Sequence, residues 1–420
     1  MMRDEGRAPT LHAIRPGRLA RALAATPLRY RDFRVLWGAT LCTGTAFAGE
    51  TIVLGWLLLE RTDSPFIVAF GVALRSLPNL LLGVLGGAVA DRFDRRAVLQ
   101  VISLQQALYT GILALLAVLG ILAVWQILLF TFIGGCSRAL RQSAQQSYAF
   151  DIVGLNEVTR GTAFMNLGQR AGGIAGSLAA GVALELWGAG AGYGMLSMAH
   201  LMGTFVLLLA QSKGQAAPKT QPSLRQGLGE YVTEMRTNRS LATIVLLTAA
   251  VEVLGFSHQA ILPSLARDLL DVGAEGLGVI SAVAMAGGLI AVLLVGIQGE
   301  LRRKGLVFLV VLHCFGAAIV VLGLSGSLTM AIFAIALVNA MAALTDLLSQ
   351  SLVQAAVPNE LRGRAMGTWV LAIGLGPVGH LQIGAVAAMA GVAAALVTNG
   401  ALLVGLAAVT LVMARGLRRL

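Results

Sequence analysis

Residues 87–96 read GAVADRFDRR, and this short polar stretch separates two long apolar runs, near 66–90 and 97–119. Each run has the roughly 20 residues that an α-helix needs to cross about 30 Å of hydrocarbon. The glycine allows a neighbouring helix to approach closely, and the arginines can hold the stretch at a membrane surface. The pattern therefore predicts a loop between two membrane-spanning helices.

The composition of the 420-residue chain extends this prediction to the whole molecule. Hydrophobic residues make up 57% of the chain and charged residues only 12%, whereas soluble proteins carry about 25% charged residues. This excludes a soluble enzyme and a disordered chain. The net charge of +11 is spread over short clusters between apolar runs, which suit loops near anionic lipid and not a nucleic-acid-binding face. We therefore expect no nucleic-acid partner.

Twelve apolar stretches are long enough to cross a bilayer. They lie near 35–59, 66–90, 97–119, 123–147, 159–184, 190–211, 241–264, 275–297, 305–324, 327–349, 365–389 and 391–413. An even number of spans places both ends of the chain on one side of the membrane. We predict an all-α integral membrane fold with twelve transmembrane helices.

The distribution of Lys and Arg predicts the orientation in the membrane. Of the 31 such residues, 25 lie in the two ends of the chain and in alternate loops, and only Arg61 and Arg267 lie on the other side. The positive-inside rule therefore predicts that both termini are cytosolic. Residues 1–34 are expected to form a basic cytosolic arm, because the apolar run after them is too long for a signal peptide. Residues 414–420 are expected to form a basic cytosolic tail.

The chain also divides into two similar halves. The longest polar segment, 212–240, resembles a flexible linker followed by an amphipathic helix, and it separates 35–211 from 241–413, with six spans each. NEVTRG at 156–161 recurs as NELRG at 359–363. Two pseudo-symmetric six-helix halves are typical of secondary transporters, whose substrate site lies between the halves near the midplane.

The stretch at 87–96 matches the pattern G-x-x-x-D-R-x-x-R-R and resembles the signature of the major facilitator superfamily in the loop between spans two and three. The resemblance implies a cytosolic latch that holds one conformation and breaks in the other. Its residues would be Gly87, Asp91, Arg92, Arg95 and Arg96. A mere topological anchor is the alternative, and both interpretations imply the same fold.

Further stretches resemble one branch of that superfamily, which contains bacterial macrolide-efflux and enterobactin-exporter relatives. They include YRDFRVLW at 30–37, RSLP at 75–78 and LPSLAR at 262–267. The resemblance implies a multi-pass transporter of the bacterial cytoplasmic (inner) membrane that exports an amphiphilic small molecule. The outward direction rests on the resemblance alone.

Two glycine-rich stretches are candidates for helix packing or hinge bending. The first is similar to the antiporter motif of drug exporters, although Ser177 stands where that motif has proline. A packing face of small residues is the alternative, and the second stretch can supply a hinge in the second half. The selected positions are Gly172, Gly176, Gly181, Gly376 and Pro377.

Acidic residues within the spans are candidates for proton coupling, because a charge at membrane depth needs a partner, water or a function. Glu50 and Arg75 lie at comparable depth, which predicts either a structural ion pair or a pair for which substrate and proton compete. Glu252 lies near the centre of span seven, the repeat counterpart of span one. Asp346 lies near the cytosolic end of span ten and can act as a gate or packing partner.

Basic residues in the first half predict a cavity wall that favours an anionic or zwitterionic cargo. Arg138 and Arg141 share one face of span four at i, i+3 spacing, although snorkelling to the interface is the alternative. Histidines within spans usually pack through hydrogen bonds, but His380 lies next to the expected hinge and can titrate. The candidate substrate-binding residues are Arg75, Arg141, Arg170, Gln169 and His380.

The sequence lacks the motifs of the common enzyme and metal sites. There is no P-loop, hydrolase or zinc-protease motif, and Cys42, Cys136 and Cys314 lie singly in apolar stretches. We expect neither an enzyme nor a metal or other cofactor. The expected partners are a small-molecule substrate, protons and membrane lipids, with a monomer as the default state.

Two alternative functions stay open. A lysophospholipid or other lipid transporter or facilitator without proton coupling would also need an apolar cavity with a basic spot. A non-transporting membrane sensor or scaffold would tolerate Gln or Leu in place of Glu50, Glu252 and Arg170.

Overall fold

A computed structural model of the chain describes residues 26–154, 157–212, 214, 238–298, 303–357, 362–414 and 416–417. Every regular element in these ranges is helical. Those before the linker are η1 (Pro27–Arg29), α2 (Arg31–Thr62), α3 (Pro65–Arg92), α4 (Arg95–Val118), α5 (Val124–Val153) and α6 (Val158–Leu208). Those after it are α8 (Arg239–Leu254), η3 (Phe256–Ile261), α9 (Leu262–Ser264), η4 (Leu265–Leu269), α10 (Ala274–Gln298), α11 (Lys304–Gly323), α12 (Leu328–Ala355), α13 (Arg362–Ile373), α14 (Gly376–Ala390) and α15 (Val392–Met413).

Membrane-spanning length and composition recur along the chain. Within the described residues, nine helical stretches are long and apolar enough to cross a bilayer. One of them, Arg160–Leu208, contains Gly188, whose backbone (φ 75°, ψ −170°) is not helical. This φ is in the region that favours glycine, so the chain changes direction inside α6. The predicted gap between the apolar stretches 159–184 and 190–211 falls at this residue.

The second half contains two further interruptions. The predicted stretch 241–264 corresponds to α8, η3 and α9, and η4 follows directly after it, so that the part of the chain after α8 is built from short turns. The predicted stretch 365–389 is divided between α13, which ends at Ile373, and α14, which begins at Gly376 with Pro377 in its first turn. Proline at this position has no backbone N–H to lose and is well tolerated there.

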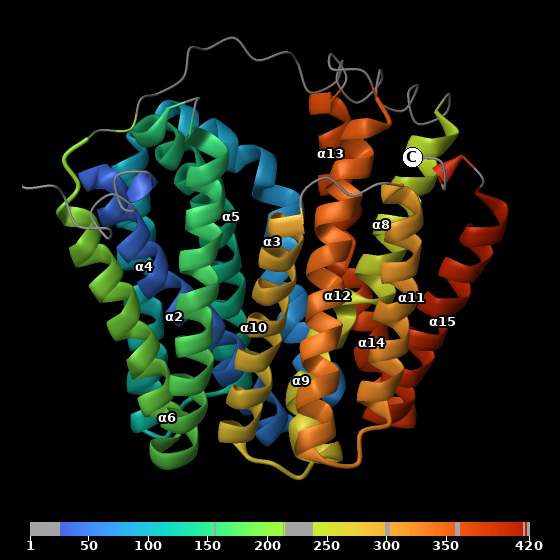
Figure 1. The fold of residues 1–420 in the computed structure, drawn as a ribbon. Coiled ribbons are helices and arrows are strands. Elements are labelled where there is room, and N and C mark those ends of the chain that lie inside the picture. Colours follow the sequence, from blue (N-terminus) through green and yellow to red (C-terminus); the bar gives the residue numbers. More distant parts are fainter. Residues whose placement is uncertain are drawn as a thin grey trace, which may run out of the picture.

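The helices pack as two groups that contact each other. In the first group α2 and α4 both pack on α6, and α3 packs on α5; in the second, α10 packs on α12, and α11 packs on α12 and α15. The groups meet where α10 packs on α6 and α14 packs on α3. Figure 1 shows the two groups diverging towards the end at which α2 begins and α15 ends.

Selected glycines lie where helices approach most closely. A Cβ at Gly172 or Gly176 would collide with the backbone carbonyls of Leu41 and Thr45, so these glycines seat α6 on α2. Gly181 lies against the backbone of Gly278 at the contact between α6 and α10. Close backbone approach through small residues is the usual way in which membrane helices associate.

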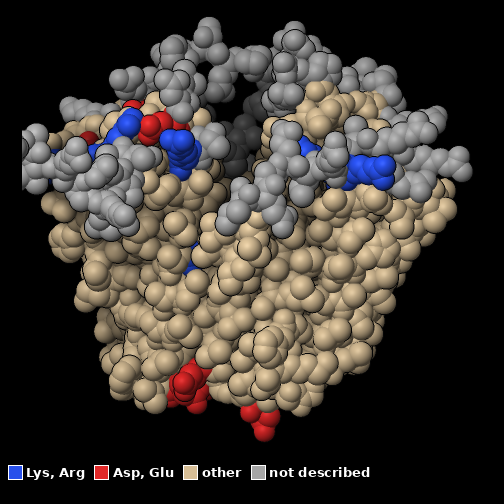
Figure 2. Space-filling view, viewed as in Figure 1, with Lys and Arg blue, Asp and Glu red and all other residues tan. Residues whose placement is uncertain are grey.

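The charged side chains separate along the long axis of the molecule. Figure 2 shows Lys and Arg gathered at the end where the helix groups diverge, and the surface is hollowed between the groups there. At the opposite end, the charged side chains in this view are acidic.

Some sequence predictions fall on residues that the structure does not describe. The arm up to residue 25, the linker from 215 to 237 and the repeat residues Asn359 and Glu360 lie outside the described residues.

Candidate functional site

A cavity of about 150 Å³ lies among α2, α4, α5 and α6. Its polar lining consists of Thr40, Thr43, Glu50, Gln106, Arg138, Arg141, Gln142, Gln145, Gln146, Thr162, Asn166, Gln169 and His200. Gly44, Phe47, Ala149 and Met165 complete the wall. A cavity of this size can hold a group about as large as benzene, whereas pockets for whole drug-sized ligands are usually about 300 Å³ or more.

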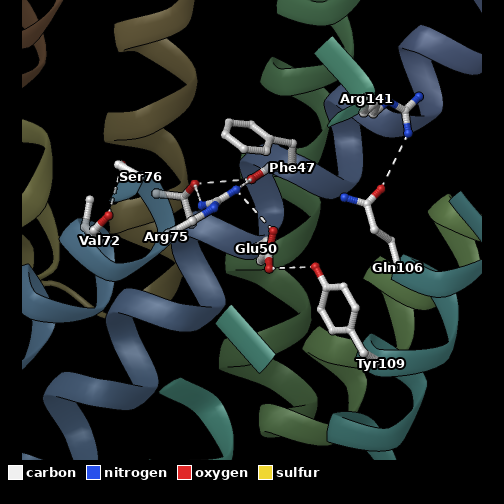
Figure 3. A network of polar contacts seen from close by, with 9 residues as sticks. Phe47, Glu50, Val72, Arg75, Ser76, Gln106, Tyr109 and Arg141 are labelled. Atoms are coloured by element: carbon white, nitrogen blue, oxygen red, sulfur yellow. Dashed lines mark hydrogen bonds and ion pairs between the residues drawn. The ribbon is translucent and has the colours of Figure 1, made fainter. Parts of the chain in front are cut away.

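A buried ion pair forms one end of the polar network (Figure 3). Arg75 of α3 approaches Glu50 of α2 with 3.1 Å between Nη2 and Oε2, and both side chains are nearly inaccessible to solvent. The guanidinium also donates to the Phe47 carbonyl at 2.9 Å and to the Thr51 hydroxyl at 2.5 Å. Tyr109 of α4 donates to Glu50 Oε1 at 3.0 Å. The structure thus contains the ion pair that the sequence allowed as one of two interpretations.

The Phe47 ring lies between two arginines. The guanidinium carbon of Arg75 is 4.0 Å from the ring centroid, and that of Arg138 is 3.6 Å from it. Cation–π contacts of this kind are favourable, more so when they are shielded from water. Arg138 makes no hydrogen bond or ion pair to any residue that the structure describes.

Arg141 is held by neutral side chains. Its Nη1 donates to Ser103 at 3.1 Å and to Gln106 at 3.5 Å, and its Nε donates to Gln145 at 3.3 Å. Gln145 in turn donates to Thr40 at 3.2 Å. These contacts compensate the guanidinium with dipoles and not with a carboxylate.

The last polar member of the wall is His200 of α6, whose side chain is only 2% exposed. Neither ring nitrogen has a hydrogen-bond partner among the described residues. Taken together, Arg75, Arg138 and Arg141 lie at or beside the cavity with Glu50 as the carboxylate in its wall. A site with more buried cations than carboxylates is suited to bind an anion.

Two of the other candidates, Arg170 and Asp346, interact at the contact between the helix groups. Arg170 of α6 reaches Gly288 of α10 and interacts electrostatically with Asp346 of α12. Asp346 also interacts electrostatically with Glu252 of α8. No ion pair within 4.0 Å joins any of these three groups to a described residue.

The remaining candidates are distributed between the two helix groups. Gln169 lines the cavity, whereas Arg170 and His380 do not. His380 and Glu252 both approach Gly376, where α14 begins. The structure therefore places Glu50, Arg75, Arg141 and Gln169 in or beside the cavity of the first group, and Glu252, Asp346 and His380 in the second group.

The stretch at 87–96 is described in part. Arg95 pairs with Asp151 of α5 at 2.6 Å, and Arg96 donates to the carbonyl of Ala210 at 2.7 Å. Asp94 caps α4 by accepting from the backbone N–H of Arg96. The side chains of Gly87, Asp91 and Arg92 lie outside the described residues. Both described arginines thus tie together helix ends within the first group.

Contacts at the end opposite the hollow join the two helix groups, and sequence reasoning did not select them. Arg267 donates to the carboxylate of Asp63 at 2.5 Å and to the carbonyl of Leu59 at 3.2 Å. Glu185 accepts from the backbone N–H of Ala274 at 2.7 Å, at the start of α10. The only sequence signal was the isolated position of Arg267 on the side with few basic residues.

Comparisons with known proteins agree with this architecture. A family model described as a transmembrane secretion effector matches residues 22–418. The enterobactin exporter EntS of Citrobacter koseri is 26% identical over 354 residues, which cover 82% of this chain and 83% of that protein. Macrolide efflux protein A of Streptococcus pyogenes is 19% identical over 294 residues, 70% of this chain and 73% of that protein.

Solved transporter structures share the fold. A peptide transporter POT variant in complex with sulfate has a TM-score of 0.74 at 12% identity, covering 95% of this chain and 98% of that one. A bacterial homologue of the human lysosomal transporter Spinster, inward-facing and occupied, has a TM-score of 0.69 at 16% identity, covering 91% and 96%. At such low identity, the likeness establishes the fold alone.

Proposed function

The chain belongs to the transmembrane secretion effector family of the major facilitator superfamily, and from this premise we propose that it exports an amphiphilic, anionic or zwitterionic small molecule by alternating access. Relatives named for efflux or export of small molecules support the direction of transport. The chemistry of the cargo rests on one observation. Arg138 and Arg141 line the cavity, and Glu50, the one carboxylate among the described lining residues, is already paired with Arg75.

The proposed layout has twelve spans in two six-helix halves, 35–211 and 241–413. The nine stretches of spanning length become twelve when α3 and α5 are added and α6 is counted as two spans that meet at Gly188. The basic end faces the cytosol of a bacterial cell at the inner membrane, in agreement with the positive-inside rule. In this orientation the hollow between the halves opens inward, and both termini are cytosolic.

The proposed coupling exchanges protons for cargo. Glu252 is 8% exposed and has no hydrogen-bond partner or ion pair among the described residues, and Asp346 is the acidic group that interacts with it. A buried carboxylate without a counter-charge in a membrane-spanning segment is a candidate to carry a proton. In the first half, an anionic cargo would compete with the Glu50 carboxylate for Arg75. The proton-coupling candidates are therefore Glu50, Glu252 and Asp346.

Transport by purified protein in liposomes tests this proposal. The cargo panel would contain an anionic, a zwitterionic and a cationic amphiphile with the same apolar tail, each measured with and without a pH gradient. We expect the gradient to drive accumulation of the anionic or zwitterionic compound. Preference for the cationic compound would contradict the cargo class. Headgroup-dependent transport that ignores the gradient would instead favour a lipid transporter or facilitator.

A matched set of variants tests the coupling groups. Glu50→Gln and Glu252→Gln each remove one buried carboxylate, and Glu60→Gln removes an exposed one at the end of α2. We expect proton release or uptake on cargo binding, measured in weakly buffered detergent, to be lost in either of the first two variants. It should be retained in Glu60→Gln. If the role of the protein in the cell is unchanged by all three substitutions, a sensor or scaffold is favoured.

A further inference from the structure

Arg138 differs from the other two arginines of the cavity in the use of its N–H groups. Arg75 directs its N–H groups to Glu50, Thr51 and the Phe47 carbonyl. Arg141 likewise donates through Nε and Nη1 to side chains of α4 and α5. Arg138 lines the cavity, yet it donates to no residue that the structure describes. Its guanidinium instead lies against the face of the Phe47 ring.

Stacking on Phe47 leaves the hydrogen-bonding edge of Arg138 free. A guanidinium donates in its own plane through five N–H groups, so a ring against its face uses none of them. The 3.6 Å contact also fixes the plane of the guanidinium, which reduces the entropy lost when a ligand binds. On the other face of the ring, Arg75 stacks on Phe47 and donates to its backbone carbonyl. Arg138 is therefore a preorganised cationic donor.

A second unpartnered donor faces the same cavity from another helix. His200 is only 2% exposed, and both of its ring nitrogens are without hydrogen-bond partners in the described part of the chain. Buried side-chain nitrogens almost always have a hydrogen-bond partner. His200 interacts electrostatically with Arg75 and Arg141, so it belongs to the basic region of the wall. Its unmet hydrogen bond indicates a polar ligand.

We propose that Arg138 and His200 together bind the oxyanion head of the cargo, a carboxylate or a phosphate; this deepens the proposed function and rests on it. Arg138 matches the planar geometry of two oxyanion oxygens, and the imidazole N–H of His200 donates to the same group from α6. The cavity of about 150 Å³ admits the head with at most one small ring. The apolar remainder of the cargo would lie outside this cavity, in the hollow between the helix groups.

Binding to the full-length protein in detergent, measured by titration calorimetry, tests the assignment without transport. The probes are para-butylbenzoate, para-butylphenyl phosphate and para-butylbenzylamine, which differ only in the head. Arg138→Gln should weaken binding of the anionic probes by about tenfold or more, because a charged hydrogen bond is lost. His200→Leu should weaken it about threefold to tenfold, and His200→Gln should restore part of the loss.

Three controls separate this assignment from folding and from the proposed function. Arg160→Gln removes an exposed charge outside the cavity and should leave binding unchanged. Arg138→Lys keeps the charge but loses the fork, so it should bind the anionic probes at intermediate strength. Thermal unfolding of each ligand-free variant identifies any that fails to fold.

The outcomes distinguish the two levels of proposal. The two anionic probes report which oxyanion is preferred. If Arg138→Gln binds both within twofold of wild type, or loses all three probes equally, the assignment to Arg138 is wrong while anion export can still stand. If the wild type binds only the amine, the proposed cargo class fails together with it.

Discussion

Glu50 and Arg75 form a buried ion pair between α2 and α3, with 3.1 Å between their charged atoms. Tyr109 donates to the second oxygen of the carboxylate, and Phe47 supplies a carbonyl to the guanidinium. A buried pair is tolerated when further hydrogen bonds satisfy its remaining atoms. These contacts explain why two charges can lie at membrane depth in one half.

The first prediction concerns the stability of this pair. Arg75→Gln should destabilise the folded protein by about 3–5 kcal/mol, because it leaves the Glu50 carboxylate buried without a counter-charge. The double variant Arg75→Gln, Glu50→Gln should recover much of this loss. Thermal unfolding in detergent, with exposed Glu60→Gln as the control, measures both effects. Additive losses in the double variant would show that the two residues do not stabilise each other.

The second prediction concerns Glu252 of α8. If it carries the exchanged proton, Glu252→Gln removes proton translocation but leaves the cargo cavity intact, because Glu252 does not line it. Counterflow of labelled cargo between equal pools should therefore persist. Accumulation driven by a pH gradient should be lost, and the pH dependence of counterflow should become flatter. Accumulation equal to that of wild type would assign coupling to another group.

Hydropathy and charge predict much of this fold because the bilayer imposes a simple rule on the sequence. Each span must satisfy its own backbone and expose apolar side chains, so α2, α10 and α15 are visible as long, mainly apolar runs. Even the break at Gly188 follows from a change in composition between two runs. The short turns η3 and η4 were not predicted, because their residues are as apolar as those of the helices around them.

The candidate site was only partly predictable, because partner choice depends on how helices are rotated against one another. Glu50 and Arg75 could be paired from their similar depth alone. Arg138 left two interpretations, and only the structure shows that it lines the cavity and stacks on Phe47. His200 was not selected, because a single histidine in an apolar run usually packs in the core. Arg170 was assigned to the cavity wall from charge, but it faces α10 and Asp346.

The third prediction concerns the end that is closed in this structure. Asp63 and Arg267 join the two helix groups there, but Asp63 is 86% exposed, so the pair contributes only about 0.5–1 kcal/mol. Asp63→Ala should therefore shift the ratio of the two end states by up to about fivefold towards opening at this end. Arg267→Ala should shift it further, because the bond to the Leu59 carbonyl is also lost.

Distances between spin labels on α2 and α10 would measure this shift. Glu275→Gln serves as the control, because Glu275 is an exposed acid at the same end and makes none of these contacts. Equal populations in Arg267→Ala and wild type would mean that apolar packing alone closes this end.

The last prediction compares two glycines of α6. At Gly176 an added Cβ would collide with the carbonyl of Thr45 on α2, whereas at Gly194 it would meet nothing within 4 Å. Gly176→Ala should therefore lower stability by about 1–3 kcal/mol, since neither backbone can yield without moving a helix. Gly194→Ala should be neutral or raise stability by up to about 1 kcal/mol, because alanine favours helix. Thermal unfolding of the two variants checks the difference. Equal behaviour would show that α6 does not pack on α2 through Gly176, and the first-half cavity between those helices would then need a different shape.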